Sequence, residues 1–303
     1  MSKIIEFIKN PNRIIWFLGA RNIVPISDEK MLKSIYKVAY NKELNLNNPQ
    51  TFNEKLQWLK LYNRKKIYTK MVDKYEAKKF VSERIGNECI VPTLGIYEKF
   101  SDIDFKKLPN KFVMKCTHDS GGLVICKDKL SLNYKKAKKR IMNSLKRNYY
   151  YASREWPYKN VKPRILIEKY LENSNEELID YKFFCFNGIP KVVLVCSERY
   201  TSDNMCETWF DSSWNLLDIV ESNHRVNPNI QKPINFEKMK GYCKKLSKGI
   251  PFLRVDFYEV NGKVYFGELT FFPASGFERF SPESWNLKLG QMIDLNMVIK
   301  NEK

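Results

Sequence analysis

The sequence lacks long hydrophobic runs and has little histidine, and these absences exclude several classes of protein. No apolar stretch in its 303 residues approaches the ~20 residues that span a bilayer. Only two histidines are present, which excludes a histidine-rich metal site. The seven cysteines form no Cys-x-x-Cys pair, so a zinc ribbon and a disulfide framework have no support, and we expect reduced, buried thiols.

Acidic residues are scarce relative to basic ones, 34 against 53, which gives a formal net charge of +19. Such a surface attracts polyanions such as nucleic acid, anionic lipid, nucleotide phosphate or an acidic sugar polymer, and charge alone does not choose among them. The hydrophobic content of 43% excludes a largely disordered chain, and the length predicts about two domains. The apolar segment 14–18 is short and Arg21 follows it, which makes a poor signal peptide, so we expect a cytoplasmic protein.

Apolar periodicity and turn residues predict a mixture of helices and strands. After a helical and irregular stretch of about 50 residues, helices are expected over 51–61, with a capping box at Thr51 and Glu54, and over 72–86, 133–148 and 235–249. Strands are expected on both sides of the loop 117–122, over 164–171, and in two hairpins over 181–200 and 252–271, each turned at Asn-Gly. Antiparallel pairs dominate, so we predict an α+β fold with several lobes.

The last predicted hairpin carries the sharpest chemical signal. Its turn at Asn261-Gly262 would place Asp256 on one strand opposite Glu268 on the other. Two like charges facing each other are destabilising, so a cation is expected between them. Mg²⁺ takes one or two carboxylates together with substrate phosphates, whereas Arg254 would neutralise a carboxylate without any metal; the residues leave both interpretations open.

The loop 117–122 contains Gly121 and Gly122 and closely follows Lys115. Glycines let backbone N–H groups approach phosphate oxygens, and a lysine can neutralise those oxygens. The loop is not a Walker A motif, because no Gly-Lys-Ser/Thr opens a helix, and an ordinary glycine turn would also explain it.

Taken in order from about residue 50 to residue 295, these features resemble the ATP-grasp superfamily, and within it the TupA-like branch found in bacterial cell-surface polymer biosynthesis. The segments typical of that branch are TFNEKLQWLKLYNR, VDKYEAKKFV, RVDFY and GELTFFPASGF, which begin at Thr51, Val72, Arg254 and Gly267. The resemblance implies an ATP-grasp fold in which antiparallel sheets clasp ATP. Residues 1–92 would form a helical extension and pre-ATP-grasp region, 93–170 a small lobe with the glycine loop, and 171–303 a large lobe with the metal site.

The resemblance also implies a nucleotide site, residue by residue. Lys74 and Lys115 would contact the phosphates, and a lid over the triphosphate would comprise His118, Asp119, Ser120, Gly121 and Gly122. The adenine hinge would be Glu168, Lys169, Tyr170 and Leu171, and Glu176 or Glu177 would hold the ribose.

The same resemblance implies the catalytic and acceptor groups. Lys182, just after Asp180, would reach the γ-phosphate, and Arg199 would steady an acyl-phosphate. Mg²⁺ would bind Asp256 and Glu268, but Thr270 stands where many members have asparagine, so a second ion would bind more loosely or through water. The acceptor site would use Arg254, Ser275, Gly276 and Arg279, with Arg279 pairing with a substrate carboxylate.

The implied activity is that of an ATP-dependent carboxylate–amine ligase, which forms an amide through an acyl-phosphate. Its partners would be a uronic acid or other acidic unit of a capsular or cell-surface polysaccharide and an amine or amino acid, with no specific nucleic acid. Peripheral association with a capsule-assembly complex at the inner face of the membrane is left open, as is whether residues 16–18 pack on the body or touch that membrane.

Two other functions compete with this one. A glycosyltransferase of the same pathway, using a nucleotide sugar and Mg²⁺, would need an acidic pair but would not explain Lys115, the glycine loop or Glu168. A nucleic-acid-binding protein would explain the basic charge, but this charge is spread along the whole chain and no DNA- or RNA-binding module is recognisable.

Overall fold

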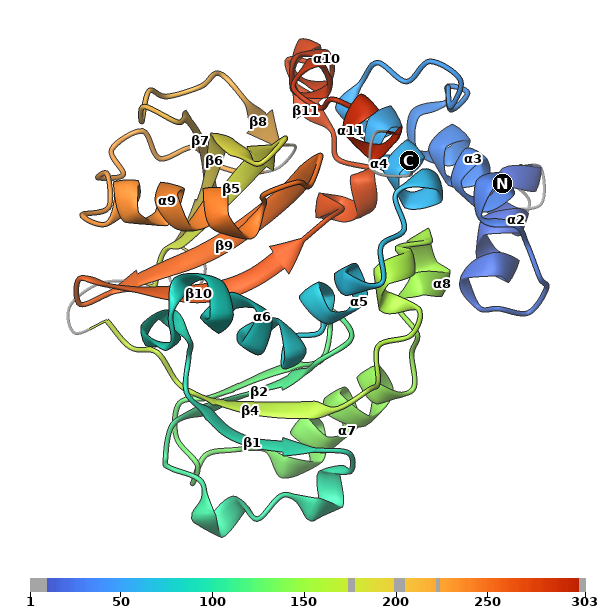
Figure 1. Ribbon diagram of the computed structural model, residues 1–303. Helices are drawn as coiled ribbons and strands as arrows, with labels where there is room; N and C mark the ends of the chain where they lie inside the picture. The colour runs from blue at the N-terminus through green and yellow to red at the C-terminus, as the bar shows by residue number, and fades with distance from the viewer. Residues whose placement is uncertain (1–9, 174–177, 199–204, 222–223, 300–303) are drawn as a thin grey trace.

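The computed structural model describes residues 10–173, 178–198, 205–221 and 224–299, and within them two antiparallel sheets form the framework (Figure 1). The smaller sheet has the order β1 (Thr93–Tyr97), β4 (Ile165–Lys169), β2 (Phe112–Cys116) and β3 (Leu123–Cys126). The larger sheet has the order β10 (Lys263–Thr270), β9 (Phe252–Val260), β5 (Asp180–Phe186), β6 (Ile189–Ser197) and β7 (Cys206–Asp211). The short strands β8 (Val220–Glu221) and β11 (Phe280–Ser281) form a third pair. The expected α+β fold with dominant antiparallel pairing is confirmed.

Helices surround the two sheets and fill the space between them (Figure 1). The α-helices are α2 (Pro11–Ala20), α3 (Asp28–Tyr40), α4 (Phe52–Tyr62), α5 (Ile67–Val72), α6 (Glu76–Ile85), α7 (Tyr134–Leu145), α8 (Tyr150–Ser153), α9 (Phe236–Leu246), α10 (Ser284–Gln291) and α11 (Asn296–Ile299). Single 3₁₀ turns are η1 (Asn87–Cys89), η2 (Phe100–Asp102), η3 (Phe105–Lys107), η4 (Trp156–Tyr158) and η5 (Pro273–Gly276). Helix α4 begins with the predicted capping box between Thr51 and Glu54.

The single helix expected over 72–86 is wrong in its first turn, and the difference positions the site. The chain leaves α5 at Asp73, whose φ of −69° and ψ of 115° are extended. The Asp73 carboxylate then accepts hydrogen bonds from the backbone N–H of Tyr75 at 2.9 Å and Glu76 at 3.2 Å, which caps α6. The break leaves Lys74 in a turn between two helices. At the other end of α6 the predicted stop holds, because Gly86 follows with φ of 97°.

The two Asn-Gly hairpin turns form as predicted, but a β-bulge alters the register of the second one. Asn261 and Gly262 have φ values of 51° and 69°, which are the left-handed values of the tight turn that best joins twisted strands. Pairing then runs regularly from Lys263 to Phe266, and shifts by one residue before Leu269. Asp256 consequently lies opposite the bulge at Gly267 and Glu268 rather than opposite Glu268 alone.

The larger sheet has one apolar face and one face, called the polar face below, that carries charged side chains among apolar ones. Helix α9 covers the apolar face, where the rings of Phe183 and Phe236 lie 5.6 Å apart. On the other face Lys182 lies directly across from Asp256 on β9 and Leu194 on β6, and side chains of cross-strand partners share a face. Polar side chains therefore gather on the face away from α9.

Two further features bear on the expectations from sequence. All seven cysteines are free and buried, as expected. Within the described residues, no helix is both long and apolar enough to cross a membrane. Trp16 donates a hydrogen bond to the Ala152 carbonyl at 3.3 Å, although Trp16 and Phe17 remain 40% and 38% exposed.

Candidate functional site

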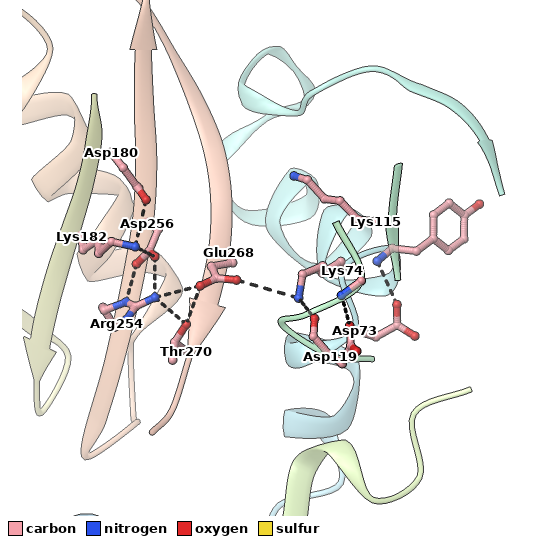
Figure 2. Close-up of polar contacts among 12 residues, drawn as sticks. Asp73, Lys74, Lys115, Asp119, Asp180, Lys182, Arg254, Asp256, Glu268 and Thr270 are labelled. Atoms are coloured by element: carbon pink, nitrogen blue, oxygen red, sulfur yellow. Dashed lines mark hydrogen bonds and ion pairs between the residues drawn. The ribbon is translucent and has the colours of Figure 1, made fainter. Parts of the chain in front are cut away.

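The polar face of the larger sheet concentrates charges that are buried and paired (Figure 2). Lys182 on β5 contacts Asp180 at 2.9 Å and Asp256 at 3.3 Å through its ammonium group. Asp256 is 1% exposed and Asp180 is 3% exposed. Burial lowers the pKa of Lys182, but the charges of Asp256 and Asp180 outweigh it and hold that pKa above its ordinary value. Lys182 is thus a fixed cation of the site.

Arg254 is the cation that lies between the two carboxylates of the hairpin (Figure 2). Its Nε and Nη2 donate to Asp256 at 2.8 and 2.7 Å, and the same Nη2 donates to Glu268 at 2.8 Å and Thr270 at 3.2 Å. The expectation of a cation at this point is therefore met by a side chain of the same strand. Metal binding by Asp256, Glu268 and Thr270 stays a prediction.

The second half of the site, which contains Lys74, Lys115 and Asp119, lies opposite the first half (Figure 2). Lys74 lies with its Nζ 4.0 Å from the Glu268 carboxylate, and the same Nζ donates to the Asp119 carbonyl at 2.7 Å. Burial raises the pKa of Glu268, but four cations, led by Lys74 and Arg254, lower it to about 2. The turn after α5 therefore joins the loop 117–122 to the predicted metal pair.

The loop predicted as a phosphate lid has an inner and an outer part. His118 is 2% exposed, and its Nε2 lies 3.2 and 3.1 Å from the carbonyls of Ser144 and Arg147 near the end of α7. Asp119 is also buried, and its carboxylate accepts from the N–H of Gly122 at 3.1 Å and from the Ser144 hydroxyl. The structure therefore turns the His118 and Asp119 side chains inward, whereas Ser120 and Gly121 are exposed.

Lys115 and the predicted adenine hinge meet at Glu168. This carboxylate is 4% exposed and accepts from Lys115 at 2.7 Å and from Lys78, which the sequence analysis did not single out. Burial raises the pKa of Glu168, but Lys115 and Lys78 together lower it below its usual value. Of the other hinge residues, Lys169 is exposed while Tyr170 and Leu171 are half-buried.

The residues predicted to bind the acceptor divide between two places. Ser275 and Gly276 lie in η5, just after the metal pair, where Ser275 has a left-handed φ of 56°. The buried ammonium of Lys60 on α4 donates to the Ser275 carbonyl at 2.7 Å, and the Ser275 hydroxyl donates to Glu155 at 2.7 Å. Arg279 instead donates to the Ala39 carbonyl at the end of α3, so the structure does not bring Arg279 to the other acceptor residues.

A cavity of about 240 Å³ lies beside the cations of the larger sheet. Its lining includes Lys182 and Arg254, and also three residues that the sequence analysis missed, Glu207, His224 and Glu278. A signal was present in the segment CETWFD, where a glutamate lies inside a strand-like composition of cysteine, threonine and aromatic residues. Histidine is also so scarce that each one could have been considered. Of the remaining predicted residues, Glu176, its alternative Glu177, and Arg199 lie outside the described residues.

The donors at the hairpin suit a magnesium–nucleotide complex. Across the described ranges, no group of three or more His, Cys, Asp or Glu side chains is placed so that it could hold a metal ion by itself. Asp256 and Glu268 supply two carboxylates and Thr270 a hydroxyl, all within one bonded group around Arg254. Mg²⁺ commonly takes one or two carboxylates and completes its shell with phosphate oxygens and water, so this donor set fits.

Comparison with known proteins gives one family match. The sequence model described as TupA-like ATPgrasp matches residues 54–294. Among solved structures, the chain is 18% identical to a D-alanine–D-alanine ligase from Bacillus anthracis complexed with ATP, with 77% of this chain and 67% of that one covered and a TM-score of 0.42. The Helicobacter pylori D-alanine–D-alanine ligase is 16% identical, with 80% of this chain and 69% of that one covered and a TM-score of 0.46. The ATP-grasp ligase PsnB complexed with minimal precursor, Mg and ADP is 11% identical, with 72% of this chain and 57% of that one covered and a TM-score of 0.40. No curated protein matches the sequence.

Proposed function

The chain belongs to the TupA-like ATP-grasp family, and on that basis we propose that it is an ATP-dependent carboxylate–amine ligase. In this proposal a substrate carboxylate takes the γ-phosphoryl group of ATP to form an acyl-phosphate, and an amine then displaces phosphate to give an amide. The products are the amide, ADP and phosphate.

One observation carries the proposal: largely buried cations and paired carboxylates face one another from two separate parts of the fold. Lys182, Arg254 and Lys74 converge on Asp256 and Glu268. A triphosphate carries several negative charges, and in-line phosphoryl transfer is catalysed mainly by cations that are held in place before the reaction. The internal ion pairs hold these side chains in that way.

Each cation has a distinct place in the proposed reaction. Lys115 and Lys74 would bind the phosphates from the side of the small sheet, and Lys182 would bind the γ-phosphate from the large sheet. Arg254, which already bonds carboxylates in two directions, would hold the carboxylate that is phosphorylated. Mg²⁺, held by Asp256 and Glu268, would supply neutralisation of phosphate charge.

For the substrate we propose a uronic acid or another acidic unit of a cell-surface polysaccharide. The support is the TupA-like family match together with a net charge of +19, which attracts acidic polymers. The amine would be an amino acid or another small primary amine.

A nucleotide-sugar glycosyltransferase receives less support from the described site. Such enzymes often hold Mg²⁺ with an Asp-x-Asp triplet, and the chain has one at Asp102-Ile103-Asp104. Both carboxylates of that triplet are exposed and make local contacts, Asp102 with the Ser101 hydroxyl at 3.0 Å and Asp104 with the N–H of Lys106 at 3.1 Å. The two aspartates therefore stabilise the turns around η2 and η3. They form none of the ion pairs that link the cations and carboxylates of the site described above.

The experiment that tests the proposal is a coupled assay for ADP release. Mg-ATP is combined with free, nucleotide-linked and oligomeric uronic acids and with a panel of amino acids and small amines. We expect ADP release that requires both a carboxylate and an amine, and its loss in Lys182→Met. The matched control is Lys191→Met on the neighbouring strand β6, where the side chain is exposed. Cleavage of a nucleotide sugar without ADP release would overturn the proposal.

A further inference from the structure

A second pair of polar side chains, Glu207 with His224, lies on strand β7 and the segment that runs beside it, on the same face of the sheet. The Nδ1 of His224 bonds the Glu207 carboxylate, which is 7% exposed, whereas the His224 side chain is 33% exposed. No part of the ligase chemistry described above uses either residue. The pair nevertheless lines the cavity that Lys182 and Arg254 also line.

Strand register places this pair in line with the catalytic cations. Asp180 lies opposite Cys196 on β6, and Cys196 lies opposite Glu207 on β7, so all three side chains share one face. Lys182 is on this face too, two residues along β5. Neighbouring strands are ~4.8 Å apart, so β7 lies ~10 Å from β5. The cavity lies over this interval, because Lys182 on β5, Leu194 on β6 and His224 beside β7 all line it.

The segment that carries His224 is fastened along β7. The N–H of Glu207 donates to the Arg225 carbonyl at 2.8 Å, and the Thr208 hydroxyl accepts from the N–H of Asn227 at 2.9 Å. The Arg225 side chain adds an ion pair to Glu198 at 2.6 Å. The imidazole is therefore oriented from two directions, by its own bond to Glu207 and by the backbone on which it stands.

The remaining charged and titratable groups around the pair cannot replace it. Lys182 and Arg254 line the cavity as cations held by carboxylates, so they do not accept protons. The thiol of Cys196 is buried and lies 3.8 Å from the other Glu207 oxygen. Glu278 also lines the cavity, and its carboxylate accepts a hydrogen bond from the N–H of Arg279 at 2.9 Å. Within the described residues, the Nε2 of His224 has no hydrogen-bond partner.

We propose that His224, oriented by Glu207, is the general base that removes a proton from the ammonium form of the amine substrate in this cavity. The proposal rests on the ligase function proposed above and adds where the amine binds and which group activates it. A carboxylate bonded to Nδ1 fixes that nitrogen as the donor and leaves Nε2 as the proton acceptor.

Two protons leave the amine nitrogen in this step. Nε2 of His224 takes one proton from the ammonium, and the freed lone pair attacks the carbonyl carbon of the acyl-phosphate. The C–N bond forms while the C–O bond to phosphate breaks, and phosphate leaves with that electron pair. Phosphate then takes the second proton from nitrogen, and the proton on His224 passes to solvent, so no oxidant, reductant or further reactant is needed.

The test compares two nucleophiles with the same acyl-phosphate. Hydroxylamine is uncharged at neutral pH and attacks without a base, whereas glycine, alanine, lysine and glutamate arrive as ammonium ions. Wild type and His224→Gln are given Mg-ATP and the uronic acid panel with each nucleophile, and hydroxamate, amide and ADP are measured. For His224→Gln we expect hydroxamate formation within about twofold of wild type and amide formation lower by about 10²–10⁴-fold. Raising the pH should shrink this deficit, because solvent then supplies more of the free amine.

The outcomes test the role of His224 separately from the ligase function. Equal amide formation by wild type and His224→Gln would overturn the role of His224 but leave the ligase proposal intact. Loss of hydroxamate and amide together would also overturn it, since His224 would then act before the amine. Absence of ADP and hydroxamate with every uronic acid in wild type would overturn the ligase proposal, and the role of His224 with it.

Two further variants separate base catalysis from simple loss of local structure. Glu207→Gln keeps the shape of the side chain but removes the charge that orients the imidazole, so we expect a smaller fall in kcat for amide formation, with KM for ATP unchanged. Arg225→Gln breaks the ion pair to Glu198 on the same segment and leaves Glu207 and His224 in place, so we expect amide formation to persist. Loss of amide formation in Arg225→Gln as severe as in His224→Gln would overturn the proposal in favour of a structural role for the segment.

Discussion

The two adjacent glycines of the loop 117–122 differ sharply in the space around them. A Cβ added at Gly122 would lie 2.3 Å from the Ser144 hydroxyl and 2.5 Å from the Cys116 sulfur. A Cβ added at Gly121 would meet only a carboxylate oxygen of Asp119, at 3.8 Å, which is ordinary contact. Gly122→Ala should therefore destabilise the protein, whereas Gly121→Ala should not.

The magnitude follows from what surrounds Gly122. Ser144 and Cys116 are 4% and 1% exposed, so neither can turn away into solvent. The Gly122 carbonyl also accepts from the Cys116 N–H at 2.7 Å, and its N–H donates to Asp119 at 3.1 Å, which fixes the backbone at this point. Forcing a methyl group into a packed site of this kind costs about 1–3 kcal/mol of stability.

Urea denaturation of the two variants measures this difference directly. We expect the free energy of unfolding of Gly122→Ala to fall by about 1–3 kcal/mol and that of Gly121→Ala to stay within about 0.5 kcal/mol of wild type. Gly122→Ala should also weaken ATP binding in calorimetry, because displacing the loop moves the Asp119 carbonyl away from Lys74. Equal stability of the two variants would refute the reasoning, since the chemical change is identical and only the surroundings differ.

Three other predictions address charges of the site. Lys115→Ala should weaken ATP binding at least tenfold in calorimetry, whereas Lys111→Ala, at an exposed position just before β2, should leave it unchanged. Unchanged affinity in Lys115→Ala would mean that the phosphates bind elsewhere. Asp256→Asn or Glu268→Gln should abolish ADP release while the near-ultraviolet circular dichroism spectrum stays native. Full activity in both variants would refute the assignment of Asp256 and Glu268 as metal ligands. Glu168→Gln should lower stability at pH 7 by about 3 kcal/mol, because Lys115 and Lys78 lose their shared carboxylate. Folding lowers the pKa of Glu168, so the stability that its charge contributes is complete above the unfolded pKa of about 4.3 and is lost as the pH falls below it. The difference in free energy of unfolding between wild type and Glu168→Gln, measured in urea, should therefore become smaller at low pH. A difference that does not change with pH would contradict this prediction.

Local signals predicted much of the fold because they depend on a few neighbouring residues. An Asn-Gly pair between apolar runs needs only its own left-handed backbone to form a turn, and both hairpins appear. The capping box at Thr51 and Glu54 is equally local. The break at Asp73 was missed because the apolar spacing continues through it, while the carboxylate that starts a new helix acts against that spacing.

The parts of the site that sequence could not predict depend on contacts between distant segments. Strand β7 lies at the edge of the sheet, next to β6, and Glu207 meets His224 only because the later segment returns to run along that edge. Lys78 shares Glu168 with Lys115 across three separate elements. The pairing of Asp256 with Glu268, which counting from the hairpin turn predicted, is modified by the bulge at Gly267 and Glu268. A glycine inside a strand indicates a bulge, but it does not give the register that results.

The cations assigned to phosphate binding are bonded to carboxylates of the protein itself: Lys115 to Glu168, Lys182 to Asp180 and Asp256, and Arg254 to Asp256 and Glu268. A bare triphosphate must compete with those carboxylates, so its affinity reflects only the difference between the two sets of bonds. A divalent ion changes this competition, because it attracts the carboxylates of the hairpin while the phosphates attract the cations. We therefore expect calorimetry to show much tighter binding of ATP with Mg²⁺ than with EDTA, and expect Glu268→Gln to reduce that difference. Equal affinity of wild type with and without Mg²⁺ would show that these ion pairs do not control nucleotide binding.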